Sequence, residues 1–341
     1  MKIINVQGEH RYPVKIGINW AQQIKNIGSI HSKVLIVAPK SIASKYKLKE
    51  NSNVKLLITG EGENQKTRNT LEKVWSKCAV EGIGRADAII GIGGGATTDL
   101  AGFAASTWLR GITWYAFPTS LAGMVDAAIG GKTGINAKTG KNLIGSFYSP
   151  AEVLIDLSFL KTLPKRDLSA GMAEVIKCGF IADYKILNLS QDEELDYPQL
   201  IARSIKVKAD VVSKDFRESK LREILNYGHT LGHAIEKNSG YKLRHGEAIS
   251  IGMVFAAELS KEFAGLSDDA VLLHRELLKN FDLPISYPAT KFKSLLALLA
   301  SDKKVKDSKF SFIGISKIGK PVWLDDVSPS KLSKVYERIA K

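Results

Sequence analysis

The chain has 341 residues, of which 44% are hydrophobic and 25% charged, and its formal net charge at pH 7 is +14. This length is enough for two domains with separate cores, and the composition excludes a disordered or fibrous chain. No signal peptide and no apolar span of about eighteen residues is recognisable, so we expect a cytoplasmic protein without a membrane partner. The two cysteines, Cys78 and Cys178, lack metal-type spacing and fit a reducing compartment.

The positive charge is consistent with binding of a nucleic acid, a membrane surface or an anionic small molecule. Lysines such as Lys45, Lys47 and Lys49 are scattered, and no basic run is interleaved with aromatic residues, which argues against nucleic acid. A basic, solvated surface is the simple explanation of the excess. We favour an anionic small-molecule substrate because basic residues also lie inside the motifs described below.

The first half of the chain alternates short apolar runs with a helical pattern. The runs predict buried strands at 34–38, 54–58, 88–92 and 114–117. Apolar residues at Leu71, Val74, Trp75 and Cys78 predict a helix over 67–78. Strand, helix and strand in this order, with a glycine-rich turn, predict a Rossmann-like parallel sheet.

Three glycines at 93–95 follow one predicted strand and precede a predicted helix. A backbone without side chains can approach a pyrophosphate, whose charge is met by free N–H groups at a helix N-terminus. A tight structural turn is the alternative. Asp99 could hold a ribose or nicotinamide-side group, or cap the helix. Glu63 and Lys66 could bind adenosine hydroxyls, or lie in a solvated loop.

The stretch 125–145 is rich in glycine and lysine and has little apolar periodicity. Its polar residues include Asp126, Lys132, Lys141 and Asn142. We interpret it as a loop that binds an anion or forms a mobile lid. Gly-Gly-Lys-Thr within it is similar to part of a P-loop, but the preceding spacing is wrong, so we discount a nucleoside triphosphate.

After Leu163 and Pro164 the pattern changes to long amphipathic segments, so we predict one domain at 1–164 and a second, mainly helical domain at 165–341. Helices are predicted at 168–180, 197–212, 221–238, 247–263, 268–280 and 291–300. An apolar run predicts a late strand at 310–315.

Three of the six histidines, His229, His233 and His245, fall within seventeen residues. His229 and His233 would share one helix face, and His245 follows from a nearby turn. Such a cluster suits a cation site or a proton-transfer site, whereas two histidines at this spacing can also simply pack or cap a helix. Thr230 stands where the helix of a zinc protease has glutamate, so peptide hydrolysis is disfavoured.

A polar stripe leads to these histidines: Glu218, Arg222, Asn226, His229 and His233 are spaced by four, four, three and four residues. A stripe of this kind on a partly apolar helix is costly to bury unless it meets a polar ligand. Gly228 interrupts the run, so the helix begins or kinks there.

Glu174 and Lys177 lie one turn apart in the first predicted helix of the second domain. A surface ion pair is the simple explanation, and Glu174 is also a candidate carboxylate ligand. Two histidines and one carboxylate leave coordination positions open for substrate oxygens, as in catalytic zinc sites.

Six linked motifs, within about residues 35 to 315, closely resemble those of the 3-dehydroquinate synthase family of sugar phosphate cyclases. They lie at 93–99, 124–134, 140–150, 171–177, 226–236 and 244–248. The resemblance implies a shikimate-pathway lyase that converts 3-deoxy-D-arabino-heptulosonate 7-phosphate to 3-dehydroquinate and phosphate. It further implies transient oxidation by NAD, β-elimination of phosphate, re-reduction, ring opening and aldol closure, a divalent metal that is usually zinc (cobalt is possible), and a homodimer.

The resemblance also implies the roles of individual residues. The metal ligands would be Glu174, His229 and His245. The NAD contacts would be Glu63, Lys66, Gly94, Gly95, Ala96, Asp99, Thr119, Ser120, Lys141, Phe159 and Thr162. The substrate would be held by Arg110, Asp126, Lys132, Asn142, Lys177, Lys208, Arg222, Asn226 and either Lys303 or Lys304, of which we favour Lys304. His233, Glu218 and Lys132 would be catalytic. A structural ion pair with Arg222 is the alternative for Glu218.

The chain departs from the family's pattern at three places. Ala38 and Pro39 stand where relatives often have Thr-Asn touching the cofactor, and Ala137 and Lys138 replace a common His-Pro. The region 190–198 is short and divergent. These differences bear on cofactor contacts rather than on the activity.

Three other functions share part of this pattern. A metal-dependent alcohol dehydrogenase of the glycerol type would show net hydride exchange and would not need Lys132, Lys141 and Lys208. Other sugar phosphate cyclases, which make inosose or valiolone rings, typically alter the pocket residues. A non-catalytic NAD- or anion-binding protein has no reason to keep Glu174 and His233 together with two metal-type histidines.

Overall fold

The computed structural model describes residues 1–300 and 310–341, so the predicted substrate residue Lys304 and its neighbour Lys303 lie outside the described residues. Contacts divide the chain into two compact units. The first contains Met1–Leu163 and Lys208–Arg217, and the second contains Pro164–Val207 and Glu218–Lys341. Within the described part of the chain, no helix has the length and apolar character needed to cross a membrane.

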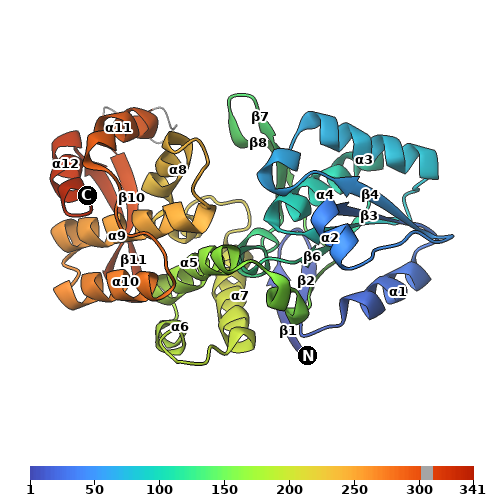
Figure 1. Ribbon diagram of the computed structural model, residues 1–341, viewed down its shortest axis with the longest axis horizontal. Helices are drawn as coiled ribbons and strands as arrows, with labels where there is room; N and C mark the ends of the chain where they lie inside the picture. Colours follow the sequence, from blue (N-terminus) through green and yellow to red (C-terminus); the bar gives the residue numbers. More distant parts are fainter. Residues whose placement is uncertain (301–309) are drawn as a thin grey trace. The chain divides into compact units, whose positions relative to one another are not determined.

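A seven-stranded sheet in the order β1-β2-β9-β6-β5-β3-β4 forms the core of the first unit (Figure 1). β1 and β2 pair antiparallel, whereas the other neighbours pair parallel. β3 and β5 are buried along their whole length, as expected of parallel strands covered on both faces. The predicted Rossmann-like parallel sheet is confirmed. Its strands are β1 (Lys2–Gln7), β2 (Arg11–Ile16), β3 (Val34–Pro39), β4 (Val54–Thr59), β5 (Ala88–Gly93), β6 (Thr113–Pro118) and β9 (Glu152–Ile155).

Helices and short turns connect these strands. The predicted helix at 67–78 is α3, and Thr67 caps its N-terminus by accepting a hydrogen bond from the Thr70 N–H. α4 begins directly after β5 with Gly94 as its N-cap, the strand–turn–helix order expected at 93–95. The helices are α1 (Trp20–Ile30), α2 (Lys40–Lys45), α3 (Arg68–Glu81) and α4 (Gly95–Thr107), and the shorter turns are η1 (Gly62–Gln65), η2 (Trp108–Arg110), η3 (Gly123–Ala127) and η4 (Leu157–Thr162).

The glycine-rich stretch is more regular than expected. β7 (Lys132–Ala137) and β8 (Gly140–Phe147) pair antiparallel and form a hairpin apart from the main sheet (Figure 1, green). The prediction of a loop over 125–145 was therefore wrong for most of its length. A Cβ at Gly145 would collide with the Thr133 carbonyl of the opposite strand. Gly145 thus allows the close pairing of β7 with β8.

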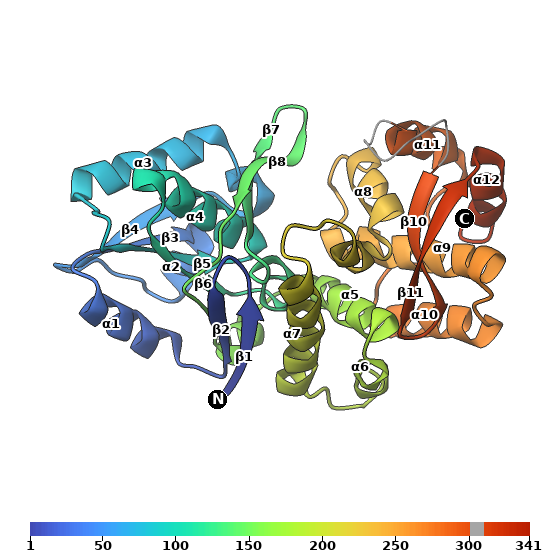
Figure 2. The same cartoon turned by 180° about the vertical axis from the view of Figure 1, so that it is seen from behind.

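The second unit is mainly helical, as predicted. Its helices include α5 (Lys165–Ile181), α6 (Tyr184–Leu189), α8 (His229–Asn238), α9 (His245–Ala264), α10 (Asp268–Asn280), α11 (Phe292–Ala300) and α12 (Pro329–Glu337), with short turns at η5 (Leu221–Asn226) and η6 (Ala289–Lys291). It also contains the part of α7 (Tyr197–Lys214) that ends at Val207. α9 is buried from Gly246 to Ser260 almost without interruption and contacts α5, α8, α10 and β10. The late strand is β10 (Phe310–Lys317), paired with β11 (Lys320–Val327), which the sequence did not predict (Figure 2).

The helix predicted at 221–238 is interrupted at Gly228, where the sequence led us to expect a start or a kink. The segment starts as the 3-10 turn η5 and breaks at Tyr227 and Gly228, and α8 begins at His229. Gly228 has φ +79°, a left-handed conformation that glycine adopts without strain. The polar stripe from Glu218 to His233 is therefore split between an irregular turn and a separate helix.

Candidate functional site

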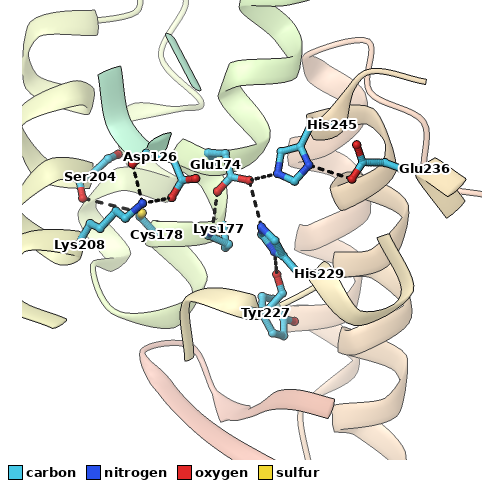
Figure 3. Close-up of polar contacts among 10 residues, drawn as sticks. All are labelled: Asp126, Glu174, Lys177, Cys178, Ser204, Lys208, Tyr227, His229, Glu236 and His245. Carbon is cyan, nitrogen blue, oxygen red and sulfur yellow. Dashed lines mark hydrogen bonds and ion pairs between the residues drawn. The ribbon is translucent and has the colours of Figure 1, made fainter. Parts of the chain in front are cut away.

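Three side chains of the second unit converge from three helices (Figure 3). Glu174 lies in the middle of α5, and His229 and His245 are the first residues of α8 and α9. Nε2 of His229 is 3.5 Å and Nε2 of His245 is 3.2 Å from Oε1 of Glu174. Ligands about 2.1 Å from a tetrahedral metal lie roughly 3.4 Å apart. The two nitrogen–oxygen distances are therefore close to those between ligands of one tetrahedral cation.

Close packing of the helix ends brings these residues together. Gly246 follows His245, and a Cβ at this position would collide with the carbonyl of Ala170, one turn before Glu174 on α5. Only glycine lets the start of α9 approach α5 so closely. At the start of α8, a Cβ at Gly228 would lie 2.8 Å from the backbone nitrogen of Met253 in α9. The positions of the two histidines thus depend on backbone contacts between α5, α8 and α9.

Glu174 is buried, yet among the described residues neither of its oxygens makes a regular hydrogen bond. Nζ of Lys177 lies 2.5 Å from Oε2 at ion-pair distance. Burial by itself would raise the pKa of Glu174, but Lys177, His229 and His245 lower it well below its usual value. The group is therefore an anionic carboxylate surrounded by nitrogen, with oxygen lone pairs that a cation could use.

The two ligand histidines have different electrostatic environments. Burial, followed by the charge of Lys177, lowers the pKa of His229 well below its usual value. Burial also opposes the charged form of His245, but the neighbouring carboxylates of Glu174 and Glu236 outweigh it and raise its pKa to about 10. His229 is therefore neutral at pH 7, whereas the two carboxylates favour the protonated form of His245.

The other residues expected in this part of the chain differ in exposure and in their partners. His233 is exposed, and its ring centroid is 5.2 Å from that of His229 and 5.9 Å from that of His245. Arg222 is buried. Asn226 donates a hydrogen bond of 3.1 Å to Oε1 of Glu218. The structure therefore gives Glu218 an amide partner in the turn η5, which follows it in the chain.

Several predicted cofactor residues of the first unit form one polar cluster. Nζ of Lys66 donates to Oδ2 of Asp99 over 2.6 Å and also to Oδ1 of Asn142. Burial opposes the charge on Lys66, but Asp99 and Glu63 outweigh it and raise its pKa. Asn136 ties the cluster to the β7–β8 hairpin, since its side chain donates to Glu63 over 2.8 Å and accepts from the Asn142 N–H over 2.9 Å.

The remaining cofactor candidates lie around the ends of the parallel strands. Gly94, Gly95 and Ala96 begin α4, and Thr119 and Ser120 follow β6. The N–H of Thr119 donates to the Gly93 carbonyl over 2.8 Å, which joins the two turns. These positions are the carboxyl edge of the sheet, where open α/β sheets bind ligands.

Phe159 and Thr162 are engaged with neighbouring side chains. The Phe159 ring is buried and packs edge-on to Tyr46, with centroids 4.8 Å apart. The Thr162 hydroxyl lies 2.6 Å from the Tyr46 hydroxyl. Any contact of Phe159 with a cofactor would therefore use its backbone.

Two of the predicted substrate residues are paired with each other. Nζ of Lys208 lies 2.5 Å from both the side chain and the carbonyl of Asp126. Lys132 and Arg110 are exposed, and Lys141 is half-buried. The structure thus brings Asp126 and Lys208 together, while Arg110, Lys132 and Lys141 remain accessible to solvent.

Three further residues, Asn136, Glu236 and Tyr227, contact predicted site residues but were not predicted from the sequence. Glu236 accepts a hydrogen bond from Nδ1 of His245, and the carbonyl of Tyr227 lies 3.1 Å from Nδ1 of His229. All three lie within or beside the quoted motifs. A metal-binding histidine usually donates a hydrogen bond from its second ring nitrogen to a nearby acceptor. This rule could have drawn attention to Glu236 and to the carbonyl of Tyr227.

Two family models match adjacent parts of the chain: 3-dehydroquinate synthase N-terminal over residues 56–170 and 3-dehydroquinate synthase C-terminal over residues 171–305. A 3-dehydroquinate synthase of Leifsonia xyli subsp. xyli is 45% identical over 99% of this chain and 98% of its own length. That of Mycobacterium leprae is 43% identical over 98% of this chain and 96% of its own.

The chain belongs to the 3-dehydroquinate synthase family. It is an enzyme of this family, a lyase-type cyclase that makes 3-dehydroquinate and phosphate. Among solved structures, a 2-deoxy-scyllo-inosose synthase complexed with carbaglucose-6-phosphate, NAD⁺ and Co²⁺ superposes with a TM-score of 0.84 and 25% identity, covering 99% of both chains. The resemblance and the fold class read from the sequence are thus confirmed, and the dehydrogenase and non-catalytic alternatives are set aside.

Proposed function

We propose that Glu174, His229 and His245 hold the divalent cation of this 3-dehydroquinate synthase, and that the cluster around Lys66 and Asp99 holds NAD. The observation that carries the first assignment is the convergence of one buried carboxylate and two Nε2 atoms at ligand-to-ligand distances. Two histidines and a carboxylate match the ligand set of a catalytic Zn²⁺, with Co²⁺ as a substitute.

The chemistry that the cation supplies when bound is polarisation of the substrate oxygens at the carbon to be oxidised. The residues around the proposed cation site keep its carboxylate ligand ionised. Glu174 remains ionised because Lys177, His229 and His245 surround it. His233 is an exposed imidazole beside the proposed ligands. We therefore propose that it accepts and holds the proton that leaves a substrate hydroxyl.

The chemistry that NAD supplies when bound is reversible acceptance of a hydride, which leaves it unchanged over the cycle. Gly94 and Gly95 would let a pyrophosphate approach the N-terminus of α4. Asp99, fixed by Lys66, would accept hydrogen bonds from ribose or nicotinamide-side groups. Glu63, held by Asn136, would meet the adenosine hydroxyls.

The substrate assignments follow the charges of the side chains. Lys132 and Asn142 on the hairpin, with Lys304, suit the phosphate that leaves. Arg222 suits the substrate carboxylate because its fork binds two oxygens. Arg110, Asp126, Lys177, Lys208 and Asn226 complete the proposed set, with Glu218 supporting His233.

The decisive test is phosphate release from 3-deoxy-D-arabino-heptulosonate 7-phosphate with catalytic NAD, before and after chelation. Phosphate should appear without accumulation of NADH, stop after EDTA treatment and return with Zn²⁺. Glu174→Gln should lower both Zn²⁺ affinity and phosphate release by at least about 100-fold. The matched control is Glu258→Gln, which changes a buried glutamate of α9 paired with Arg275 at 2.7 Å.

Glu258→Gln is expected to lose stability but to keep Zn²⁺ affinity. Steady accumulation of NADH without phosphate would contradict the proposed chemistry. Full Zn²⁺ affinity in Glu174→Gln would instead contradict the ligand assignment. The homodimer remains a proposal, which the molar mass in solution tests.

A further inference from the structure

Each histidine of the candidate cation site has its second ring nitrogen engaged, but the two partners differ. Nδ1 of His229 lies 3.1 Å from the backbone carbonyl of Tyr227, and Nδ1 of His245 lies 3.1 Å from Oε2 of Glu236. Carbonyl and ionised carboxylate oxygens only accept hydrogen bonds, so Nδ1 carries the hydrogen in both rings. In a neutral ring, this leaves the lone pair on Nε2, the atom that faces Glu174.

The position of Glu236 depends on the packing of α8 and α9. It lies on α8 two turns after His229, and its residue exposure is only 4%. Figure 3 shows its carboxylate on the far side of the His245 ring from Glu174. A buried carboxylate is unfavourable without compensating hydrogen bonds. The contact with His245 satisfies part of that requirement and fixes the plane of the ring.

We propose that Glu236 is a positioning residue of the cation site, which orients His245 and strengthens Nε2 of that ring as a ligand. The inference rests on the proposed function of Glu174, His229 and His245. A carboxylate behind an imidazole increases its basicity and fixes its tautomer, whereas the carbonyl behind His229 contributes only a dipole. His245 is thus the histidine whose binding strength depends on a neighbouring charge.

A competing arrangement uses the same atoms. Potential ligand atoms of His233, Glu236 and His245 also lie within 4.8 Å of one another, which would make Glu236 a direct ligand of a second cation. His245 would then bind two cations through both nitrogens and lose its Nδ1 hydrogen. A neutral imidazole has only one lone pair to offer, so we favour the hydrogen-bonded arrangement with one cation.

The experiment measures Zn²⁺ affinity of the full-length chain by competition with a chromophoric chelator, and records the visible absorption of the Co²⁺-loaded protein. Glu236→Gln retains an acceptor of similar shape but removes the charge, and Glu236→Ala removes both. We expect Zn²⁺ affinity to fall about 10- to 100-fold in Glu236→Gln and further in Glu236→Ala. The Co²⁺ bands should shift while one equivalent is still bound.

Glu258→Gln is the matched control, because Glu258 is also buried and lies on α9, about 20 Å along the helix from His245. Urea unfolding of the metal-free proteins reports stability separately. The control should lose stability yet keep both the Zn²⁺ affinity and the Co²⁺ spectrum of the parent. A change of affinity confined to the Glu236 variants distinguishes a positioning role from a merely structural one.

Unchanged affinity and spectrum in Glu236→Gln would overturn the proposal. So would binding of two equivalents by the parent with one lost in Glu236→Gln, since Glu236 would then be a ligand. Failure of the proposed cation site itself is a different result: the parent would bind no Zn²⁺, or Glu174→Gln would bind it as tightly as the parent.

Discussion

Lys66 shows how one enclosed charge organises the cofactor residues of the first unit. It is 1% exposed, and Asp99 and Asn142 accept hydrogen bonds from its amino group. A lysine this deeply buried is tolerated because the carboxylate beside it compensates for lost hydration. The pair therefore fixes Asp99 in one orientation before any cofactor binds.

We expect Lys66→Met to weaken NAD binding and to destabilise the protein by about 3–5 kcal/mol, because Asp99 would be left without its cation. NAD titration by fluorescence and urea unfolding measure the two effects. Lys77→Met is the control: Lys77 pairs with Glu81 at 2.9 Å and with Glu50 at 3.2 Å, and its side chain is partly exposed, so the loss should be about 1 kcal/mol or less. Equal losses in both variants would show that Asp99 does not depend on Lys66.

Individual residues were predictable where a motif carried them. The Gly-His-Thr and Arg-His-Gly-Glu motifs identified His229 and His245, and the structure brings both to Glu174. Glu236 and Asn136 stayed unassigned, because their role depends on which helix or strand packs beside them. The spacing of residues in the sequence does not show that Glu236 of α8 contacts His245, the first residue of α9.

At the scale of elements, Gly246 controls the distance between α9 and α5. A Cβ there would overlap the Ala170 carbonyl, so we expect Gly246→Ala to move His245 away from Glu174. Zn²⁺ affinity should fall at least about tenfold, with a loss of stability of about 1–3 kcal/mol. Chelator competition and urea unfolding measure both.

Gly28→Ala is the control for Gly246→Ala. Gly28 lies within α1, where a Cβ would make only ordinary contacts, the nearest at 3.5 Å. Alanine in a helix interior should be neutral or stabilising by up to about 1 kcal/mol. Normal Zn²⁺ affinity in Gly246→Ala would mean that α9 can shift without moving its first residue.

His274 of α10 is a buried, neutral group with a defined acid response. Tyr227 donates to its Nε2 over 2.9 Å, its Nδ1 donates to the Ala270 carbonyl over 2.6 Å, and Phe180 stacks on its ring. Burial lowers its pKa to about 3. Below about pH 6.5 an unfolded chain binds a proton here that the folded protein does not, so stability falls as the pH drops.

Through His274, the free energy of unfolding should fall by at most about 1.4 kcal/mol for each pH unit between about 6.5 and 3. Above about pH 6.5, His274 should cause no change of the free energy of unfolding with pH. Urea unfolding of the parent and of His274→Gln across this range measures it. The parent should show the steeper loss on acidification. Parallel curves for the two proteins would mean that His274 accepts a proton inside the fold.

Strands and helices with strong patterns were predicted closely, and weakly patterned ones were missed. β3, β5 and α10 lie within one residue of their predicted bounds because each is a continuous apolar run or a clear amphipathic helix. β1 is largely exposed, so it lacked a hydrophobic signal. The break before His229 was left open by the pattern, since a glycine can kink a helix or end it.

For the whole molecule, the net charge of +14 should assist capture of an anionic substrate. We expect kcat/KM for the heptulosonate phosphate to fall several-fold between about 0.01 M and 0.15 M ionic strength, as the screening length shrinks from about 30 to 8 Å. kcat should change little, because binding rather than chemistry is screened. Initial rates at several salt concentrations test this, and a salt-independent kcat/KM would exclude long-range attraction.

The first unit is not one continuous piece of chain, since Lys208–Arg217 belongs to it by contacts. Within that unit the Ser213 hydroxyl accepts from the Gln7 N–H over 2.9 Å, and the Phe216 ring packs on Phe147 with centroids 5.4 Å apart. A gene fragment that ends at Leu163 would therefore encode an incomplete fold. Swapping halves between relatives at Leu163 would pair the first unit with a 208–217 segment from another protein, so such a chimaera should be less stable than either parent.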